Sequence, residues 1–328
     1  MASQKLASVQ DLYGPLSTKS CLKRKPNEED RQWLRNELSD EPFIGLHLQL
    51  SDSTPDDDVR FGPTFNALIN CEKFFNAHNK VEHVLSNLKL TSGQSDNIFA
   101  MTVGQRGNWL WEAYRVGRLM SNSFGIILKA LEKQNISPSL INSLKDDCFD
   151  KVIPPWSAIT KKMALSLFSE IMDLPVKQCG VYLHKSGALG CSPDGLTDDS
   201  IVEIKCPYSN DSESDLLNEL RSGTWYMMPR ETTTNSVSYS RDGKVVHVFN
   251  EDDLVFNLKH RQGINYHHQV QGSLHLLNKD KCNFILSTPV TTLIVPIRKD
   301  PCWRRNIDIL LDFYRNIFIF SMLKEFTS

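Results

Sequence analysis

The sequence lacks the features of zinc-finger proteins, of small proteins stabilised by disulfide bonds and of membrane-spanning proteins. Its eight cysteines include no C-x-x-C pair, with which a zinc finger usually begins, and they do not form the framework of a small secreted domain. The first residues contain no apolar stretch typical of a signal peptide, and the apolar run at residues 317–323 is far too short to cross a bilayer. We therefore expect an intracellular protein with free thiols, nuclear or cytoplasmic, not secreted and without a membrane partner.

The sequence also lacks an overall basic excess. Its 37 lysines and arginines face 39 aspartates and glutamates, which gives a formal net charge of −2. Histone-like proteins are excluded, and any surface that binds nucleic acid must be basic only locally. Hydrophobic residues at 40% and charged residues at 23% are typical of a folded globular protein.

The first hundred residues differ from the rest in their patchy apolar periodicity. Residues 1–100 are predicted to form an accessory segment, mostly helical or irregular and partly flexible, and residues 101–328 a second domain. The basic cluster Lys23-Arg24-Lys25 has the composition of a nuclear import signal, but a solvated charge cluster is the simpler interpretation.

Periodicity predicts an α/β order of elements in the second domain. Apolar residues at helical spacing indicate helices at 109–131, 156–172, 265–277 and 303–324. Alternation and turn residues indicate strands at 180–184, 189–191, 201–206, 282–287 and 292–297, and a hairpin at 237–249. We therefore expect a mixed central sheet flanked by helices.

Two carboxylates and a lysine form the most informative pattern in the chain. Asp194 lies between Pro193 and Gly195, which indicates a bend, and the strand at 201–206 carries Glu203 and Lys205 on one face. If the two segments pair, Asp194 and Glu203 converge, with Lys205 beside them. Such a group is suited to a hard cation such as Mg²⁺ and to phosphodiester hydrolysis, with Lys205 acting on a water molecule. A salt bridge on an exposed strand is the alternative that the spacing alone leaves open.

The residues around this pattern resemble those of a known family. The stretches Ser192-Pro-Asp-Gly-Leu and Val202-Glu-Ile-Lys-Cys-Pro are similar to the YqaJ-like viral recombinases of the phage lambda exonuclease group. Two further stretches, at 111–125 (W-x-x-x-R-x-G-R) and 266–275 (Y-x-x-Q-V-Q-G-x-L-H), agree in order and spacing. The resemblance covers about residues 105–326 and implies a restriction-endonuclease-like core of the PD-(D/E)xK type.

This resemblance implies a role for each matching residue. Asp194 and Glu203, with the Ile204 carbonyl, would hold Mg²⁺, or alternatively Mn²⁺, Lys205 would act on the attacking water, and Gln271 would lie beside them. Phosphate and DNA contacts would come from Arg115, Arg118, Ser121 and Asn122. The implied activity is 5′-to-3′ exonuclease digestion of linear duplex DNA with a 5′-phosphate, in recombination or repair. A homo-oligomer is an open alternative to a monomer.

Two positions depart from the family pattern. Asn122 stands where the family has a serine, and an amide can still donate to phosphate. Lys161 stands where the family has a glutamate that joins the metal site, so a carboxylate is replaced by a cation. This change should lower metal affinity. It leaves a second function open, in which a catalytically impaired, nuclease-derived module binds DNA or a partner.

Overall fold

The structure, a computed structural model, describes residues 60–146, 155–207, 216–221, 225–230, 236–241 and 243–326. The chain divides into two compact units, residues 1–54 and 55–328, and every described residue belongs to the second. The predicted import cluster at 23–25 lies outside the described residues. The predicted domain boundary near residue 100 stays a prediction, because residues 1–59, most of the predicted N-terminal segment, also lie outside the described residues.

The described elements alternate between helices and strands, as predicted. The helices are α5 (Phe65–Asn70), α6 (Glu72–Phe75), α7 (Lys80–Asn87), α8 (Ser92–Met101), η1 (Gln105–Gly107), α9 (Trp109–Ala113), α10 (Ser121–Glu132), α11 (Pro138–Asp146), α12 (Pro155–Met172), α13 (Leu216–Arg221), α14 (Arg261–Leu277), η2 (Pro301–Arg304), α15 (Arg305–Phe313), the π-helical η3 (Tyr314–Phe318), α16 (Ile319–Met322) and η4 (Lys324–Phe326). The strands are β1 (Leu119–Met120), β2 (Tyr182–Leu183), β3 (Leu189–Cys191), β4 (Gly195–Leu196), β5 (Ser200–Lys205), β6 (Met227–Pro229), β7 (Ser236–Arg241), β8 (Lys244–Phe249), β9 (Leu254–Phe256), β10 (Lys281–Ser287) and β11 (Thr291–Arg298).

The helix predicted at 109–131 is interrupted in the structure. It forms α9 and α10, with β1 between them pairing in parallel with β3. Gly117 has φ +70°, a conformation that interrupts a right-handed helix, and a Cβ there would meet the Phe65 ring at 2.2 Å. The apolar period runs through the break, which is why the sequence alone suggested one helix.

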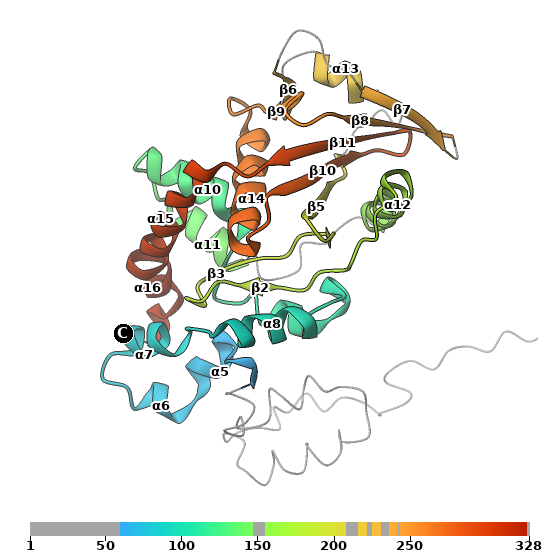
Figure 1. Ribbon diagram of the computed structural model, residues 1–328. Helices are drawn as coiled ribbons and strands as arrows, with labels where there is room; N and C mark the ends of the chain where they lie inside the picture. The colour runs from blue at the N-terminus through green and yellow to red at the C-terminus, as the bar shows by residue number, and fades with distance from the viewer. Residues whose placement is uncertain are drawn as a thin grey trace, which may run out of the picture. The chain divides into compact units, whose positions relative to one another are not determined.

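A six-stranded mixed sheet forms the centre of the second unit (Figure 1), which confirms the predicted fold class. Its strand order is β4-β5-β10-β11-β8-β7. The β5–β10 and β11–β8 pairs are parallel, and the other pairs are antiparallel. Two small sheets, β1-β3-β2 and β6-β9, stand beside it. The predicted hairpin at 237–249 is confirmed as β7 and β8.

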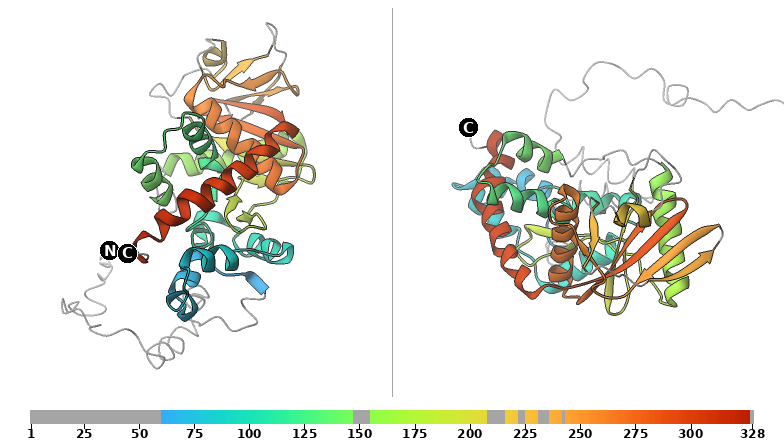
Figure 2. Two further views of the ribbon diagram at one scale, coloured as in Figure 1. Left: turned by 90° about the vertical axis from the view of Figure 1, so that its left-hand side faces the viewer. Right: turned by 90° about the horizontal axis from the view of Figure 1, so that it is seen from above.

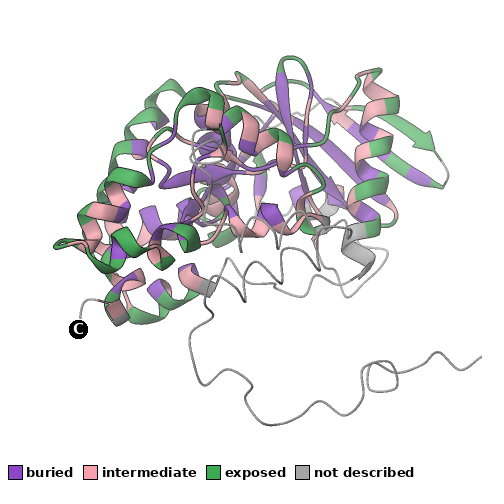
Figure 3. Cartoon of the chain, turned by 90° about the horizontal axis from the view of Figure 1, so that it is seen from below, coloured by how far each residue is buried: buried purple, intermediate pink, exposed green. Residues whose placement is uncertain are grey.

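The two faces of the large sheet are covered by different helices. Val202 and Ile204 of β5 pack against Ala164 and Phe168 of α12. Ile201 points to the other face, where Val270 and Leu274 of α14 lie. This alternation follows from the period of two in a strand, and it leaves the central strands β5, β10 and β11 buried from both sides, whereas the outer strand β7 is exposed (Figure 3). The predicted inward direction of residues 202, 204 and 206 is thus confirmed.

A second hydrophobic core lies beside the sheet and is built from helices. The closing helix α15 packs on α10, and α16 follows it along the chain (Figure 2). The core shared by these helices contains Phe124, Trp303 and Tyr314, and it also takes Phe65 and Leu88 from the early helices. Residues from α5 and from the end of α7 are therefore part of the same core as the later helices. Among the described residues, no helix is long and apolar enough to cross a membrane.

Candidate active site

Asp194 lies in a loop that two more distant side chains hold in place. Its neighbour Ser192 accepts a hydrogen bond from Trp111 Nε1 at 2.8 Å, and the Pro193 carbonyl accepts one from Gln105 Nε2 at 2.8 Å. The loop leads directly into β4, which pairs with β5 in the register Gly195 to Val202. Asp194 therefore stands opposite Glu203, and the convergence predicted from the spacing is confirmed.

The Asp194 carboxylate is also fixed by the backbone of β5. Its Oδ2 accepts a hydrogen bond from the Ile204 amide at 2.7 Å. Strand β4 begins only at Gly195, opposite Val202, so in the described chain residues 203–205 of β5 have no paired strand on this side, and the aspartate takes the place of the missing strand there. Only 14% of the Asp194 side chain is exposed.

Glu203, Lys205 and Gln269 form a closed triangle of hydrogen bonds. Lys205 Nζ donates to Glu203 Oε1 at 2.7 Å and to Gln269 Oε1 at 2.9 Å. Gln269 Nε2 donates to the same Glu203 oxygen at 2.7 Å. The Tyr266 ring lies 5.1 Å from Lys205 Nζ and adds a cation–π contact. These contacts hold the lysine and the glutamate in one geometry.

Lys161 reaches the same group from helix α12. Its Nζ donates to Asp194 Oδ1 at 2.8 Å, so both oxygens of Asp194 already have a donor. The Lys161 side chain is 33% exposed, against 5% for Glu203. The group is therefore more accessible to solvent at Lys161 than at Glu203.

The charges of this group balance without any added ion. Two carboxylates, Asp194 and Glu203, face two ammonium groups, Lys161 and Lys205. Burial raises the pKa of Glu203, against the opposing effect of Lys205. Burial lowers the pKa of Lys161, but Asp194 and Glu203 outweigh it, and the net pKa is raised. Lys161 therefore keeps its positive charge at neutral pH.

The oxygen donors of the site suit a divalent cation, with one obstacle. Asp194, Glu203 and the Ile204 carbonyl are hard oxygen ligands of the kind that Mg²⁺ prefers. Within the described part of the chain, however, no group of three or more His, Cys, Asp or Glu residues could hold a metal. A cation that binds here has to displace Lys161 from Asp194 Oδ1 or to bind beside it. The residues fit a weakly held ion better than a tightly held one.

Gln269, and not Gln271, is the glutamine beside the carboxylates. Gln271 is buried and points away from them, donating to the Arg298 carbonyl at 2.8 Å and accepting from the Asp300 amide at 2.8 Å. Two residues along a helix differ by about 200° in direction, so only one of the pair can face the sheet edge. The role predicted for Gln271 therefore has to be corrected to Gln269. Both glutamines lie in the same motif, and only the position of the helix distinguishes them.

The residues predicted to contact phosphate fall into two groups. Arg115 lies over the Trp111 ring, 4.2 Å from its centroid, near the loop that carries Asp194. Asn122 is exposed in the first turn of α10. Ser121, by contrast, is buried and accepts a hydrogen bond from Ser273 of α14 at 3.1 Å, which makes it a packing residue.

Arg118 is a structural residue, and its predicted contact with phosphate does not agree with its position. Only 2% of it is exposed. Its guanidinium donates to the carbonyls of Gly187, Tyr114 and Pro63 at 2.8, 3.0 and 2.9 Å. These bonds join three segments of chain. The sequence could not show this, because a buried and an exposed arginine look the same in a local motif.

We expect Arg118→Met to destabilise the fold and Arg115→Met to leave it nearly unchanged. The first change leaves three buried carbonyls without their donor, at a cost of about 3 kcal/mol of unfolding free energy, or roughly 6–10 °C in Tm. The second removes a contact with Trp111 that is worth about 1 kcal/mol or less. Thermal unfolding of both variants checks this, and equal Tm values would contradict the structural role of Arg118.

Comparisons with known proteins find matches only among solved structures. No family model and no curated protein matches the sequence. The alkaline exonuclease LHK-Exo from Laribacter hongkongensis is 16% identical, covering 66% of this chain and 96% of that chain, with a TM-score of 0.43. The shutoff and exonuclease protein of Kaposi's sarcoma-associated herpesvirus is 14% identical, covering 93% and 87%, with a TM-score of 0.46. A phage-related exonuclease from Haemophilus somnus is 12% identical, covering 64% and 96%, with a TM-score of 0.40.

These three structures are of exonucleases, the kind of protein that the motifs of this chain resemble. Identities of 12–16% and TM-scores of 0.40–0.46 assign no function and no residue role to this chain. Its chemistry therefore has to be inferred from the residues of the site itself.

Proposed function

We propose that this chain is a metal-dependent deoxyribonuclease. The observation that carries the proposal is the convergence of Asp194, Glu203 and Lys205 at the free edge of β5. Two carboxylates and an amine in one partly buried group suit the hydrolysis of a phosphodiester, in which a water molecule has to be oriented and negative charge on phosphate neutralised.

Each residue of the group has a distinct task in this proposal. Asp194 and Glu203, with the Ile204 carbonyl, would hold Mg²⁺ or Mn²⁺, which would supply Lewis-acid stabilisation of the phosphate. Lys205 would act on the attacking water by donating a hydrogen bond that orients it, and its ammonium would stabilise negative charge on the phosphate. Gln269 is a positioning residue, because it holds both Glu203 and Lys205 through direct hydrogen bonds.

Linear duplex DNA with a 5′-phosphate is the substrate that we propose. Arg115 is held by Trp111, which also binds the Ser192 hydroxyl two residues before Asp194. A guanidinium in this place suits a terminal phosphate next to the hydrolytic group, because it can donate two parallel hydrogen bonds. Asn122 supplies a further amide donor on the exposed end of α10.

The test is digestion of linear duplex DNA that carries a label at the 5′ or the 3′ end. With Mg²⁺ or Mn²⁺ in the millimolar range, we expect 5′-labelled nucleotides to be released first. We also expect a 5′-phosphorylated end to be digested faster than a 5′-hydroxyl end, and closed circular DNA to remain intact. Early loss of circular DNA would contradict an exonuclease, and release of the 3′ label first would contradict the direction.

A second candidate function is favoured by one specific contact. Lys161 Nζ lies 2.8 Å from Asp194 Oδ1 and balances the charge that a metal would otherwise balance. If no hydrolysis occurs at any metal concentration while the chain still binds DNA, the chain is a nuclease-derived binding module. This outcome would replace the first candidate.

A further inference from the structure

Lys161 is the charged side chain of the hydrolytic group that is most open to solvent. This group consists of Lys161, Asp194, Glu203 and Lys205. The Lys161 side chain is 33% exposed, against 14% for Asp194, 18% for Lys205 and 5% for Glu203. It reaches the carboxylates from helix α12, whereas the other three come from β5 and the loop before β4. A phosphate that enters the group from solvent therefore has more access to Lys161 than to any other charge in it.

The Lys161 ammonium has hydrogen-bond donors that its contacts among the described residues do not use. An ammonium carries three N–H donors. Within the described part of the chain, Lys161 uses one of them, for Asp194 Oδ1 at 2.8 Å. Lys205 uses two, for Glu203 Oε1 and Gln269 Oε1. Lys161 is therefore better able than Lys205 to take a further acceptor, and a phosphate oxygen is an acceptor of opposite charge.

The ion pair with Asp194 leaves oxygen ligands for a divalent cation. A carboxylate offers about four acceptor positions, and Asp194 uses two of them, for Lys161 and for the Ile204 amide. Both hydrogen bonds that the Glu203 side chain accepts from described residues go to Oε1, so its Oε2 remains for an ion. Asp194 and Glu203 can thus bind a cation while Lys161 stays beside them. Their negative charge would then be shared with the ion, which leaves Lys161 a positive charge for an incoming phosphate.

We propose that Lys161 is a catalytic residue, which donates a hydrogen bond to a non-bridging oxygen of the phosphate that is hydrolysed. This inference rests on the proposed function. In the hydrolysis, the water oxygen bonds to phosphorus and the ester bond breaks, so that its electron pair leaves with the ester oxygen. The water gives up one proton, and the ester oxygen takes one up from solvent. Lys161 keeps its own proton and stabilises the negative charge that grows on the phosphate oxygens.

Two other roles of Lys161 predict different behaviour. A lysine that only obstructs the metal would, when removed, let both metal affinity and the rate of hydrolysis rise. A lysine that only links α12 to the Asp194 loop would affect the stability of the fold but not the salt dependence of DNA binding. A lysine that binds the phosphate predicts a third pattern, in which its removal gives tighter metal binding, weaker phosphate binding and slower turnover.

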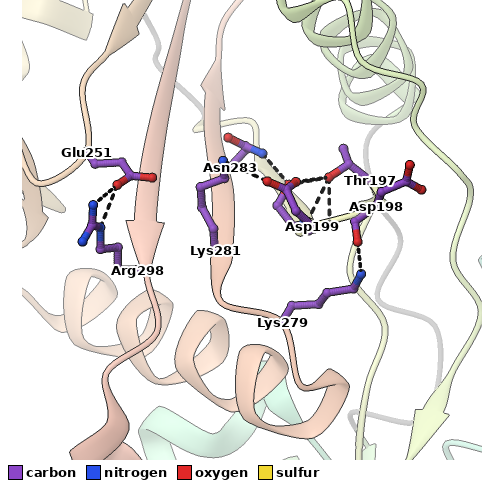
Figure 4. A network of polar contacts seen from close by, with 9 residues as sticks. Thr197, Asp198, Asp199, Glu251, Lys279, Lys281, Asn283 and Arg298 are labelled. Carbon is purple, nitrogen blue, oxygen red and sulfur yellow. Dashed lines mark hydrogen bonds and ion pairs between the residues drawn. The ribbon is translucent and has the colours of Figure 1, made fainter.

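The variants to compare are Lys161→Met, Lys161→Gln and Lys161→Arg. Glutamine keeps a donor for Asp194 if methionine disturbs the fold, and arginine keeps the charge. Lys281→Met is the matched control, because Lys281 is 30% exposed and also has a carboxylate partner, Asp199 at 3.3 Å. Lys281 lies at the start of β5 and β10, whereas Glu203 and Lys205 lie towards the other end of this strand pair (Figure 4).

The experiment has three readouts, each taken after Tm values have shown that the variants fold. DNA affinity is measured against salt concentration by fluorescence anisotropy, with a short 5′-phosphorylated duplex in EDTA so that no hydrolysis occurs. Calorimetric titration gives the Mn²⁺ affinity without DNA. The rate of hydrolysis is measured on end-labelled linear DNA at saturating Mn²⁺.

We expect Lys161→Met and Lys161→Gln to lose about 0.9 from the slope of log affinity against log salt, which is the value for one phosphate contact. Lys161→Met should bind Mn²⁺ more tightly than native chain, since a cation beside the carboxylates is removed, yet turn over about a hundredfold more slowly. Lys161→Arg should keep the native slope and a rate within about tenfold of native, because it keeps the charge but not the shape of the donor. Lys281→Met should match native chain in all three readouts.

Two results would overturn the catalytic role of Lys161 and leave the proposed function intact. One is a native salt slope in both Lys161→Met and Lys161→Gln, and the other is hydrolysis by Lys161→Met at or above the native rate. Absence of hydrolysis by the native chain at every metal concentration would overturn the proposed function and this inference together.

Discussion

Asp194→Asn should abolish hydrolysis of DNA, with a loss of about a thousandfold or more. The asparagine keeps the shape of the side chain, and its amide oxygen still accepts from the Ile204 amide. What it loses is a full negative charge in the group proposed to hold the metal. Loss of one carboxylate ligand removes several kcal/mol of transition-state stabilisation, and about 4 kcal/mol corresponds to a thousandfold in rate.

The control for this prediction lies four residues further along the chain. Asp198 has an 88% exposed side chain that pairs with Lys177 at 3.3 Å, so Asp198→Asn removes the same charge outside the hydrolytic group. Its activity should stay within about twofold of native, as surface ion pairs contribute little. Both rates are measured with end-labelled linear DNA, after equal Tm values have shown that both variants fold. Residual activity of Asp194→Asn near the native rate would contradict a hydrolytic role for Asp194.

Lys161→Glu should lower the metal concentration at half-saturation by at least about tenfold. The change replaces a cation bound to Asp194 Oδ1 with a third carboxylate. The charge at position 161 changes from +1 to −1, which is two units in favour of the ion. At an effective dielectric constant of about 20, each unit changes the interaction energy with the ion by a few kcal/mol at contact distance, and solvation removes part of this gain. Tenfold requires only about 1.4 kcal/mol, so the prediction is conservative.

The measurement for Lys161→Glu does not depend on activity. Calorimetric titration with Mn²⁺ gives the affinity directly, and the rise of Tm with Mn²⁺ gives it independently through linkage. Without metal, Lys161→Glu should unfold at a lower temperature than native, because three carboxylates then repel one another. Lys162→Glu is the matched control, since Lys162 is exposed on the same helix and about 100° away.

Two outcomes of this titration would contradict the account of the site. Equal Mn²⁺ affinities of Lys161→Glu and native chain would mean that Lys161 does not compete with metal for Asp194. Equal gains in Lys161→Glu and Lys162→Glu would mean that any added negative charge on α12 attracts the ion, without a specific site. If hydrolysis appears in Lys161→Glu but not in native chain, the binding-module function applies.

The hydrolytic group could be predicted from the sequence as far as local rules extend. The period of two in a strand places Glu203 and Lys205 on one side and residues 202 and 204 on the other, whatever the rest of the fold does. The bend at Pro193-Asp194-Gly195 and the short connection to β5 bring Asp194 opposite Glu203. These relations join residues that are ten or fewer positions apart, so pattern and spacing were enough to find them.

The identity of the residues that complete the site depends on contacts between distant segments. Lys161 and Asp194 are 33 residues apart, and Gln269 and Glu203 are 66 apart. The motif contains both Gln269 and Gln271 and gives no information on which side of α14 faces β5. The two side chains point about 200° apart around the helix axis, so the orientation of the helix decides which glutamine contacts the Glu203 carboxylate.

The sequence by itself determined which residues carry charge, which alternate in and out of the sheet, and that the chain would form a mixed α/β core. Only the tertiary structure decided that Lys161 binds Asp194, that Arg118 is enclosed by backbone carbonyls, and that Gln269 lies beside Glu203. The physical reason is that charge and periodicity are properties of short segments. Burial and pairing arise only when helices and strands far apart in the chain pack together.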